Sequence, residues 1–174
     1  MARIVTLTMN PALDIATSLD RLVPERKLRC DAPRYDPGGG GINVARAAHA
    51  LGGDAVAVFP AGGAAGELIA HLLREEGVTY AIVPIAGFTR ESLNVVERES
   101  GKQYRLILPG PELGASDQQR CLDTLASAAA GAAYLVASGS LPPGVPADFY
   151  GDVAVLARRL GVRLVLDTSG PARA

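Results

Sequence analysis

The stretch PGGGGINVAR, residues 37–46, decides how the rest of this sequence is interpreted. Four consecutive glycines allow positive φ angles and a close approach of the backbone to a ligand. An apolar periodic segment over residues 42–52 follows and predicts a helix, whose free N–H groups point back at the glycines. Asn43 lies in its first turn, where the amide can donate and accept. We predict a loop that binds sugar hydroxyls or an anion; a plain flexible turn is the alternative.

Two better-known glycine motifs do not fit this chain. A dinucleotide-binding loop needs a third glycine where Asn43 stands, and it needs a buried strand where residues 34–37 read RYDP. A Walker A loop needs Ser or Thr after Gly-Lys, but Gly101-Lys102 is followed by Gln103. An oxidoreductase that binds NAD(H) is therefore disfavoured.

Outward from the glycines, apolar strands alternate with amphipathic helices. Strands are predicted at residues 3–9, 56–59, 78–83, 134–137 and 162–166. Further helices are predicted at residues 64–75, 117–130 and 147–160. This order predicts an α/β fold, a Rossmann-type parallel sheet flanked by helices on both faces.

Two more polar stretches interrupt this alternation. Residues 14–36 are expected to be extended, and residues 91–109 read as a β-hairpin that turns at residues 100–102. We predict that they form an accessory β-layer, a small lid, with strands within residues 14–36 and 88–109. The whole chain, residues 1–174, is then expected to be part of one domain.

Composition excludes several classes of function. The chain has 174 residues, a formal net charge of -1 and 48% hydrophobic residues. It therefore has no general attraction for nucleic acid or acidic membranes, and no apolar run approaches the roughly 20 residues of a membrane helix. Cys30 and Cys121 lack metal-ligand spacing, so a reduced, cytoplasmic protein is expected. His49 and His71 fall within predicted helices and suggest no catalytic triad or metal site.

Four charged residues are candidates for binding a sugar phosphate. Asp14 follows the first strand in NPALD, where its carboxylate could accept two sugar hydroxyls or could equally form an Asx turn. Arg90, Arg105 and Lys27 could together hold a phosphate, because Arg matches phosphate oxygens bidentately and Lys adds a point charge. Solvated surface charge is the alternative for each of them.

Two hydroxyls follow a later buried strand. Ser138 and Ser140 lie in ASGSLPPG, residues 137–144, and are expected at the same sheet edge as Asp14. A tight strand-to-helix connection would explain the prolines and glycines without the serines. Neither Asp14 nor Asp167 has the glycine-rich surroundings of a convincing catalytic base.

Taken in order, TLTMNPALD at residues 6–14, the glycine run, Thr89-Arg90 and SGSLPPG at residues 138–144 resemble the PfkB branch of the ribokinase superfamily. The resemblance covers the whole chain and implies a ribokinase-like core with a β-sheet lid that commonly forms a homodimer contact. It also implies which residues face the sugar phosphate: Asp14, Gly39, Gly40, Asn43, Arg90 and Ser138 or Ser140, with Lys27 reaching the ligand from the lid.

The activity implied is a 6-phosphofructokinase-type transfer of the ATP γ-phosphoryl group, with Mg²⁺, to the C1 hydroxyl of fructose 6-phosphate in glycolysis. A 1-phosphofructokinase, a tagatose-6-phosphate kinase or a non-catalytic sugar-phosphate-binding fragment are the alternatives. The C-terminal family signature, which carries the catalytic Asp, has no counterpart here. We therefore expect an incomplete chain that does not turn over alone, with its base beyond residue 174.

Overall fold

The computed structural model describes residues 2–168 and contains a five-stranded parallel sheet with the order β5-β4-β1-β8-β9. Its strands are β1 (Ile4–Leu7), β4 (Ala55–Ala61), β5 (Thr79–Pro84), β8 (Tyr134–Ser138) and β9 (Arg163–Asp167). The helices are α1 (Gly40–Ala50), α2 (Gly63–Glu75), α3 (Ala115–Ala129) and α4 (Phe149–Leu160). The predicted α/β class, with a parallel sheet flanked by helices, is confirmed.

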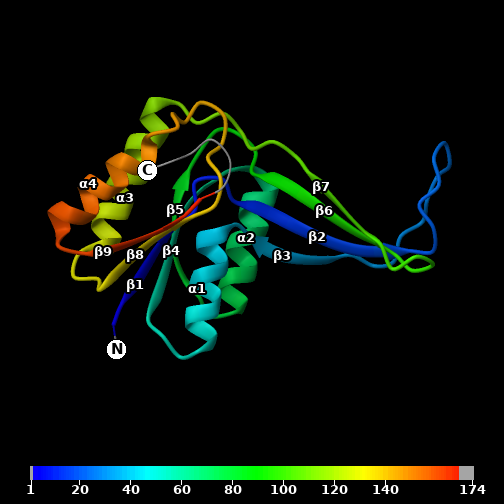
Figure 1. Ribbon diagram of the computed structural model, residues 1–174, viewed down its shortest axis with the longest axis horizontal. Coiled ribbons are helices and arrows are strands. Elements are labelled where there is room, and N and C mark those ends of the chain that lie inside the picture. The colour runs from blue at the N-terminus through cyan, green and yellow to red at the C-terminus, as the bar shows by residue number, and fades with distance from the viewer. Residues whose placement is uncertain (1, 169–174) are drawn as a thin grey trace.

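The helices cover the two faces of this sheet in pairs. Figure 1 shows α1 and α2 on one side of the strands and α3 and α4 on the other. Each face has its own apolar core. Ile42, Ile69 and Phe59 belong to the first core, and Leu125 and Phe149 belong to the second. Every residue of β4 is buried, as expected for a strand covered on both faces.

Helix boundaries follow the glycines of the sequence. Helix α1 begins at Gly40, two residues before the predicted start, because the last two glycines of the run already belong to its first turn. Helix α4 ends at Gly161, which takes the left-handed conformation with φ of 69°.

A second sheet projects from the first, as Figure 1 shows. It has four strands in the order β3-β2-β6-β7, namely β2 (Ala12–Leu19), β3 (Arg34–Gly38), β6 (Arg90–Glu97) and β7 (Gln103–Ile107). β6 and β7 form an antiparallel hairpin, whereas β2 and β6 pair in parallel. Residues 34–37, described above as no buried strand, belong to β3, a strand that is exposed at its start.

Residues 20–33 form an irregular loop at the far end of the second sheet. Arg98 closes the neck of this loop, donating to the Asp20 carboxylate at 2.7 Å and also to Asp31 and Ser18. Thr17 donates to the main-chain oxygen of Asp31 at 2.9 Å. The loop therefore has a defined path across the end of the sheet, although only the flanking residues are strands.

Candidate functional site

The strand order of the core sheet reverses between β1 and β8, because the chain moves from β1 outward to β4 and β5 and then returns to β8 and β9. Ligands of open α/β sheets bind at such a reversal, outside the carboxyl ends of the strands. Asn10 follows β1 at this edge and Ser140 follows β8. Asn10 Nδ2 donates to Ser140 Oγ at 3.1 Å, so the two loops meet.

The glycine run brings the start of α1 to the same point. Gly39 has φ of 119° and precedes the helix. A Cβ at Gly40 would overlap Ser138, so only glycine lets α1 pack this closely on the loop after β8. The buried Thr8 hydroxyl accepts the N–H of Ile42 at 2.9 Å, which satisfies one free donor of the first turn. Asn43 is exposed at the same helix end.

A cavity of about 920 Å³ lies between this edge and the second sheet. Most of the strand residues that line it alternate along each projecting strand, because alternate side chains share one face of a sheet; Ile15 and Leu93 depart from this alternation. The sheets, α1 and the adjoining loops contribute the polar and glycine residues Asn10, Asp14, Arg34, Asp36, Gly39, Gly40, Asn43, Arg90, Ser92, Asn94, Gln103, Arg105, Gly110 and Ser140. The apolar lining residues are Ala12, Ile15, Ala16, Leu93, Ile107, Leu108, Pro109, Leu141 and Pro143.

Among the described residues, Asp14 is one of two partly buried carboxylates that line this cavity, and the other is Asp36. The Asp14 oxygens lie against Gly38, where any Cβ would overlap them. Burial raises the pKa of Asp14 above its ordinary value, while the nearby Arg90 and Arg105 act in the opposite direction. A partly desolvated carboxylate between two guanidinium groups is a strong acceptor for ligand hydroxyls.

The raised pKa of Asp14 predicts a gain in stability from Asp14→Asn. The folded chain binds a proton at Asp14 more readily than the unfolded chain, so this group favours folding below its unfolded pKa and loses that contribution as pH rises through its folded pKa. At pH 7 the variant should be more stable than the wild type, by a small amount because solvent screens the half-buried Asp14 carboxylate. Urea denaturation at pH 7 and pH 3 should show this gain at pH 7 only; a loss at pH 7 would contradict it.

Arg90 connects the two sheets. Its guanidinium donates to the main-chain oxygen of Asn10 at 3.1 Å, to Ser92 Oγ at 3.3 Å and to the main-chain oxygen of Leu108 at 3.4 Å. Burial lowers its pKa and Asp14 opposes that shift. The cation is thus held in place at the cavity wall by Ser92 of its own strand and by the segments that follow β1 and β7.

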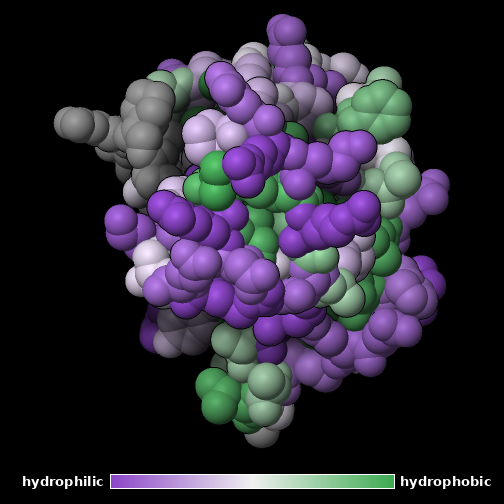
Figure 2. Space-filling view, turned by 90° about the vertical axis from the view of Figure 1, so that its right-hand side faces the viewer, coloured by the Kyte–Doolittle hydropathy of each residue, from purple (hydrophilic) through white to green (hydrophobic). Residues whose placement is uncertain are grey.

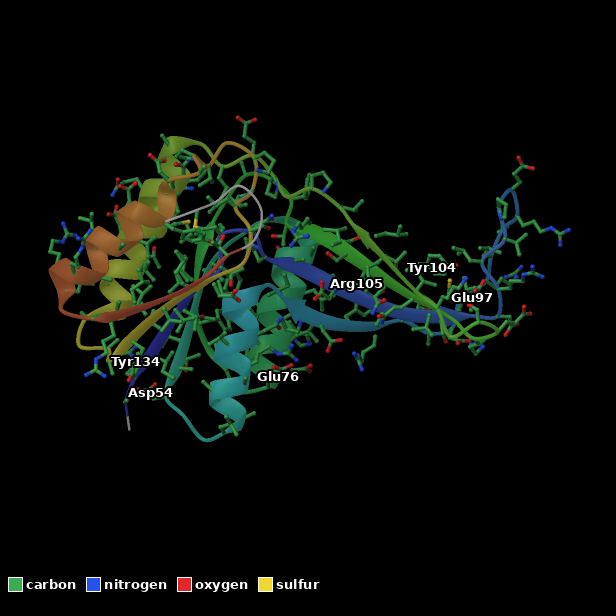
Figure 3. All side chains as sticks on the ribbon, viewed as in Figure 1. Asp54, Glu76, Glu97, Tyr104, Arg105 and Tyr134 are labelled. Atoms are coloured by element: carbon green, nitrogen blue, oxygen red, sulfur yellow. The ribbon has the colours of Figure 1, made fainter. Side chains whose placement is uncertain are left out.

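Arg105 lies further along the second sheet, opposite Asn94 in the β6–β7 ladder. Figure 3 shows it on the part of the sheet nearer the core, with Glu97 closer to the far tip. Arg105 is exposed and lines the cavity. Unlike Arg90, it makes no hydrogen bond to a main-chain oxygen among the residues that the structure describes.

The structure brings together most of the residues proposed from sequence. Asp14, Gly39, Gly40, Asn43, Arg90, Arg105 and Ser140 line the cavity. Ser138 does not: it is 3% exposed and donates to Asp167 Oδ2 at 3.1 Å. Lys27 is exposed on the loop of residues 20–33 and is not among the lining residues, so its role in substrate binding stays a prediction.

Other lining residues were not identified from sequence. Asp36 pairs with Asp14 across β2 and β3, and Ser92 pairs with Asp14 across β2 and β6. Asn94 follows Ser92 on the same face. Ser92 and Asn94 could have been predicted from the alternation of polar and apolar residues within residues 92–98, because residues two apart in a strand share a face and these two follow Arg90. Asn10 could have been found from its position at the end of the first strand.

Comparisons with known proteins agree on one group. The sequence pattern of the pfkB family carbohydrate kinases matches residues 7–174. The ATP-dependent 6-phosphofructokinase isozyme 2 of Mycobacterium tuberculosis is 60% identical over 168 residues, covering 97% of this chain and 50% of that protein. The 1-phosphofructokinase of Xanthomonas campestris is 37% identical over 166 residues, covering 95% of this chain and 52% of that protein.

A solved structure with the same fold is phosphofructokinase-2 from Escherichia coli in complex with fructose-6-phosphate. It is 46% identical, superposes with a TM-score of 0.92, and the match covers 99% of this chain and 56% of that chain. The chain spans about half the length of the relatives it matches.

Proposed function

Because the chain belongs to the pfkB family of carbohydrate kinases, we propose that it forms the sugar-phosphate-binding part of a phosphofructokinase that acts on fructose 6-phosphate. The reaction is transfer of the ATP γ-phosphoryl group to the C1 hydroxyl, as a step of glycolysis. The relatives named for this activity, at 60% and 46% identity, support this substrate over those of the more distant relatives.

The observation that carries the proposal is that Asp14 of β2 and Arg90 of the neighbouring β6 line one cavity beside the start of α1. A phosphorylated sugar needs an acceptor for its hydroxyls and a fixed cation for its phosphate. Asp14 and Asn43 would orient the sugar, while Arg90, with Arg105, would hold the phosphate. Ser140 and the backbone of Gly39 and Gly40 would complete the contacts.

ATP is the proposed phosphoryl donor, with Mg²⁺ as its counterion, because phosphoryl transfer needs charge neutralisation at the transferred group. Among residues 2–168 no three Asp, Glu, His or Cys side chains gather as a metal site. In this proposal the residues of this chain bind and orient the sugar phosphate.

The proposed assembly is a homodimer formed through the second sheet, which would act as the lid. Leu106 is 54% exposed on β7, and the neighbouring Ile107 and Leu108, which also line the cavity, are 64% and 54% exposed. Figure 2, which looks at the projecting side, shows hydrophobic surface between hydrophilic side chains. Such exposed apolar surface is typical of protein contacts.

We propose a cytoplasmic location, since Cys30 and Cys121 are both free thiols. None of the helices within residues 2–168 has the length and apolar character needed to cross a membrane.

Calorimetric titration of the 174-residue chain with fructose 6-phosphate tests the proposal. We expect binding at least about tenfold tighter than that of fructose, because only the phosphate can use the arginines. Fructose 1-phosphate and tagatose 6-phosphate, titrated in parallel, test the alternative substrates. Equal affinity for fructose and fructose 6-phosphate would overturn the proposal, and tighter binding of another sugar phosphate would replace the substrate.

A further inference from the structure

Asn10 joins the two sides of the cavity through two different groups. It lies between β1 and β2, where the chain passes from the core sheet into the second sheet. Its main-chain oxygen accepts Arg90 Nη2 at 3.1 Å and Arg90 Nε at 3.4 Å. Its side-chain Nδ2 donates to Ser140 Oγ at 3.1 Å. One residue therefore contacts both a cation and a hydroxyl of the proposed site.

The surroundings of Asn10 determine which way its amide points. Oδ1 is buried and has no hydrogen-bond partner among the described residues. It faces Gly110, so closely that a Cβ at that position would overlap it. A carbonyl oxygen tolerates a backbone Cα–H beside it, whereas an NH₂ group there would be a buried donor without an acceptor. Nδ2 is therefore the atom that faces Ser140.

This orientation sets the direction of the Ser140 hydroxyl. A serine hydroxyl has one hydrogen to donate and two lone pairs that accept. The Asn10 amide occupies one lone pair, and within residues 2–168 the Ser140 hydrogen has no acceptor. Ser140 also lines the cavity. Its hydrogen is therefore available to an atom in the cavity.

We infer that Asn10 is a positioning residue that presents Ser140 as a hydrogen-bond donor to the bound sugar phosphate. The inference rests on the proposed function. The ligand atom that meets Ser140 is then an acceptor oxygen, such as a phosphate oxygen or the ring oxygen of the sugar, and not a hydroxyl that donates.

Asn10→Asp tests the inference because it nearly preserves shape but replaces the donor by an acceptor. The carboxylate would take the Ser140 hydrogen and remove it from the cavity. Fructose 6-phosphate affinity is measured by calorimetry for the wild type, Asn10→Asp, Ser140→Ala and the double variant, all as the 174-residue chain. Ser140→Ala should weaken binding about tenfold in the wild type and less than about twofold in Asn10→Asp.

The added negative charge of Asn10→Asp weakens binding whether residue 140 is Ser or Ala. Its effect on affinity therefore cancels when the effect of Ser140→Ala is compared with and without Asn10→Asp. Ser127→Ala, on the exposed surface of α3, is the matched control and should change neither background. Asn10→Ala gives a second cycle if Asn10→Asp does not fold, and it too should shrink the effect of Ser140→Ala. The same tenfold loss in all backgrounds would overturn the inference while leaving the proposed function intact. Absence of fructose 6-phosphate binding by the wild type would overturn both.

Discussion

Gly41→Ala is expected to destabilise the chain by about 2–4 kcal/mol, the largest effect of any single methyl group that we predict. A Cβ at Gly41 would lie 2.5 Å from the main-chain oxygen of Leu7 and 2.7 Å from Thr8 Oγ1. Leu7 ends β1 and Thr8 follows it, and both are buried, so neither can move without disturbing the core sheet. Helix α1 would have to shift away from β1.

Thermal unfolding measures this effect, and the melting temperature should fall by roughly 5–15 °C. Gly151→Ala is the matched control, because this glycine lies inside α4 and an added Cβ meets nothing within 4 Å. Alanine is the better helix former, so the control should gain about 0.5–1 kcal/mol. A melting temperature of Gly41→Ala within about 2 °C of the wild type would show that α1 does not need this close approach.

The core sheet was predictable because its strands carry a local signal. Residues 134–137 form a short apolar run between two helical patterns, and such runs are buried strands of parallel sheets. No comparable local sequence pattern predicts that β2 pairs with β6. These strands are parallel, Ala12 faces Arg90 in the ladder, and whole βα units separate them in sequence. Only tertiary packing brings them together.

The types of residue in the site could be predicted from the sequence, but the direction in which each side chain points could not. Ser138 and Ser140 are two positions apart, yet one is buried on Asp167 and the other lines the cavity. Gly139, with φ of 112°, turns the backbone between them. Tyr150 supports this turn by donating from its hydroxyl to the Gly139 oxygen at 2.9 Å. In a regular strand Ser138 and Ser140 would point to the same face, so the alternation pattern of a strand does not predict this turn.

Lys27 illustrates a different limit. Its position depends on the path of residues 20–33, which no periodic pattern describes. The contacts that set this path involve Arg98, a residue of the distant β-hairpin. The position of a loop residue can therefore be predicted only when the residue that closes the loop is known. Here that residue, Arg98, is far away in the sequence and no local pattern identifies it.

Arg90→Ala is expected to weaken fructose 6-phosphate binding by about 2–3 kcal/mol, which corresponds to roughly 30- to 150-fold in Kd. Arg90 is the guanidinium that main-chain oxygens of Asn10 and Leu108 hold at the cavity wall. Such a fixed cation loses little entropy when a phosphate binds, so its removal costs more than that of an exposed arginine. Arg105→Ala, which lacks these main-chain contacts, should cost less.

Calorimetry at several salt concentrations separates a phosphate contact from a structural role of Arg90. Loss of a charge pair should flatten the salt dependence of the affinity for fructose 6-phosphate, whereas a general loosening of the fold should leave that dependence unchanged. Arg120→Ala is the matched control, because Arg120 donates to the main-chain oxygen of Pro84 and to Asp117 but lies outside the cavity lining. Its removal should change stability without changing Kd. If Arg90→Ala retained the wild-type affinity and salt dependence, the phosphate would have to lie elsewhere in the cavity, and Arg105 would be the next guanidinium to test.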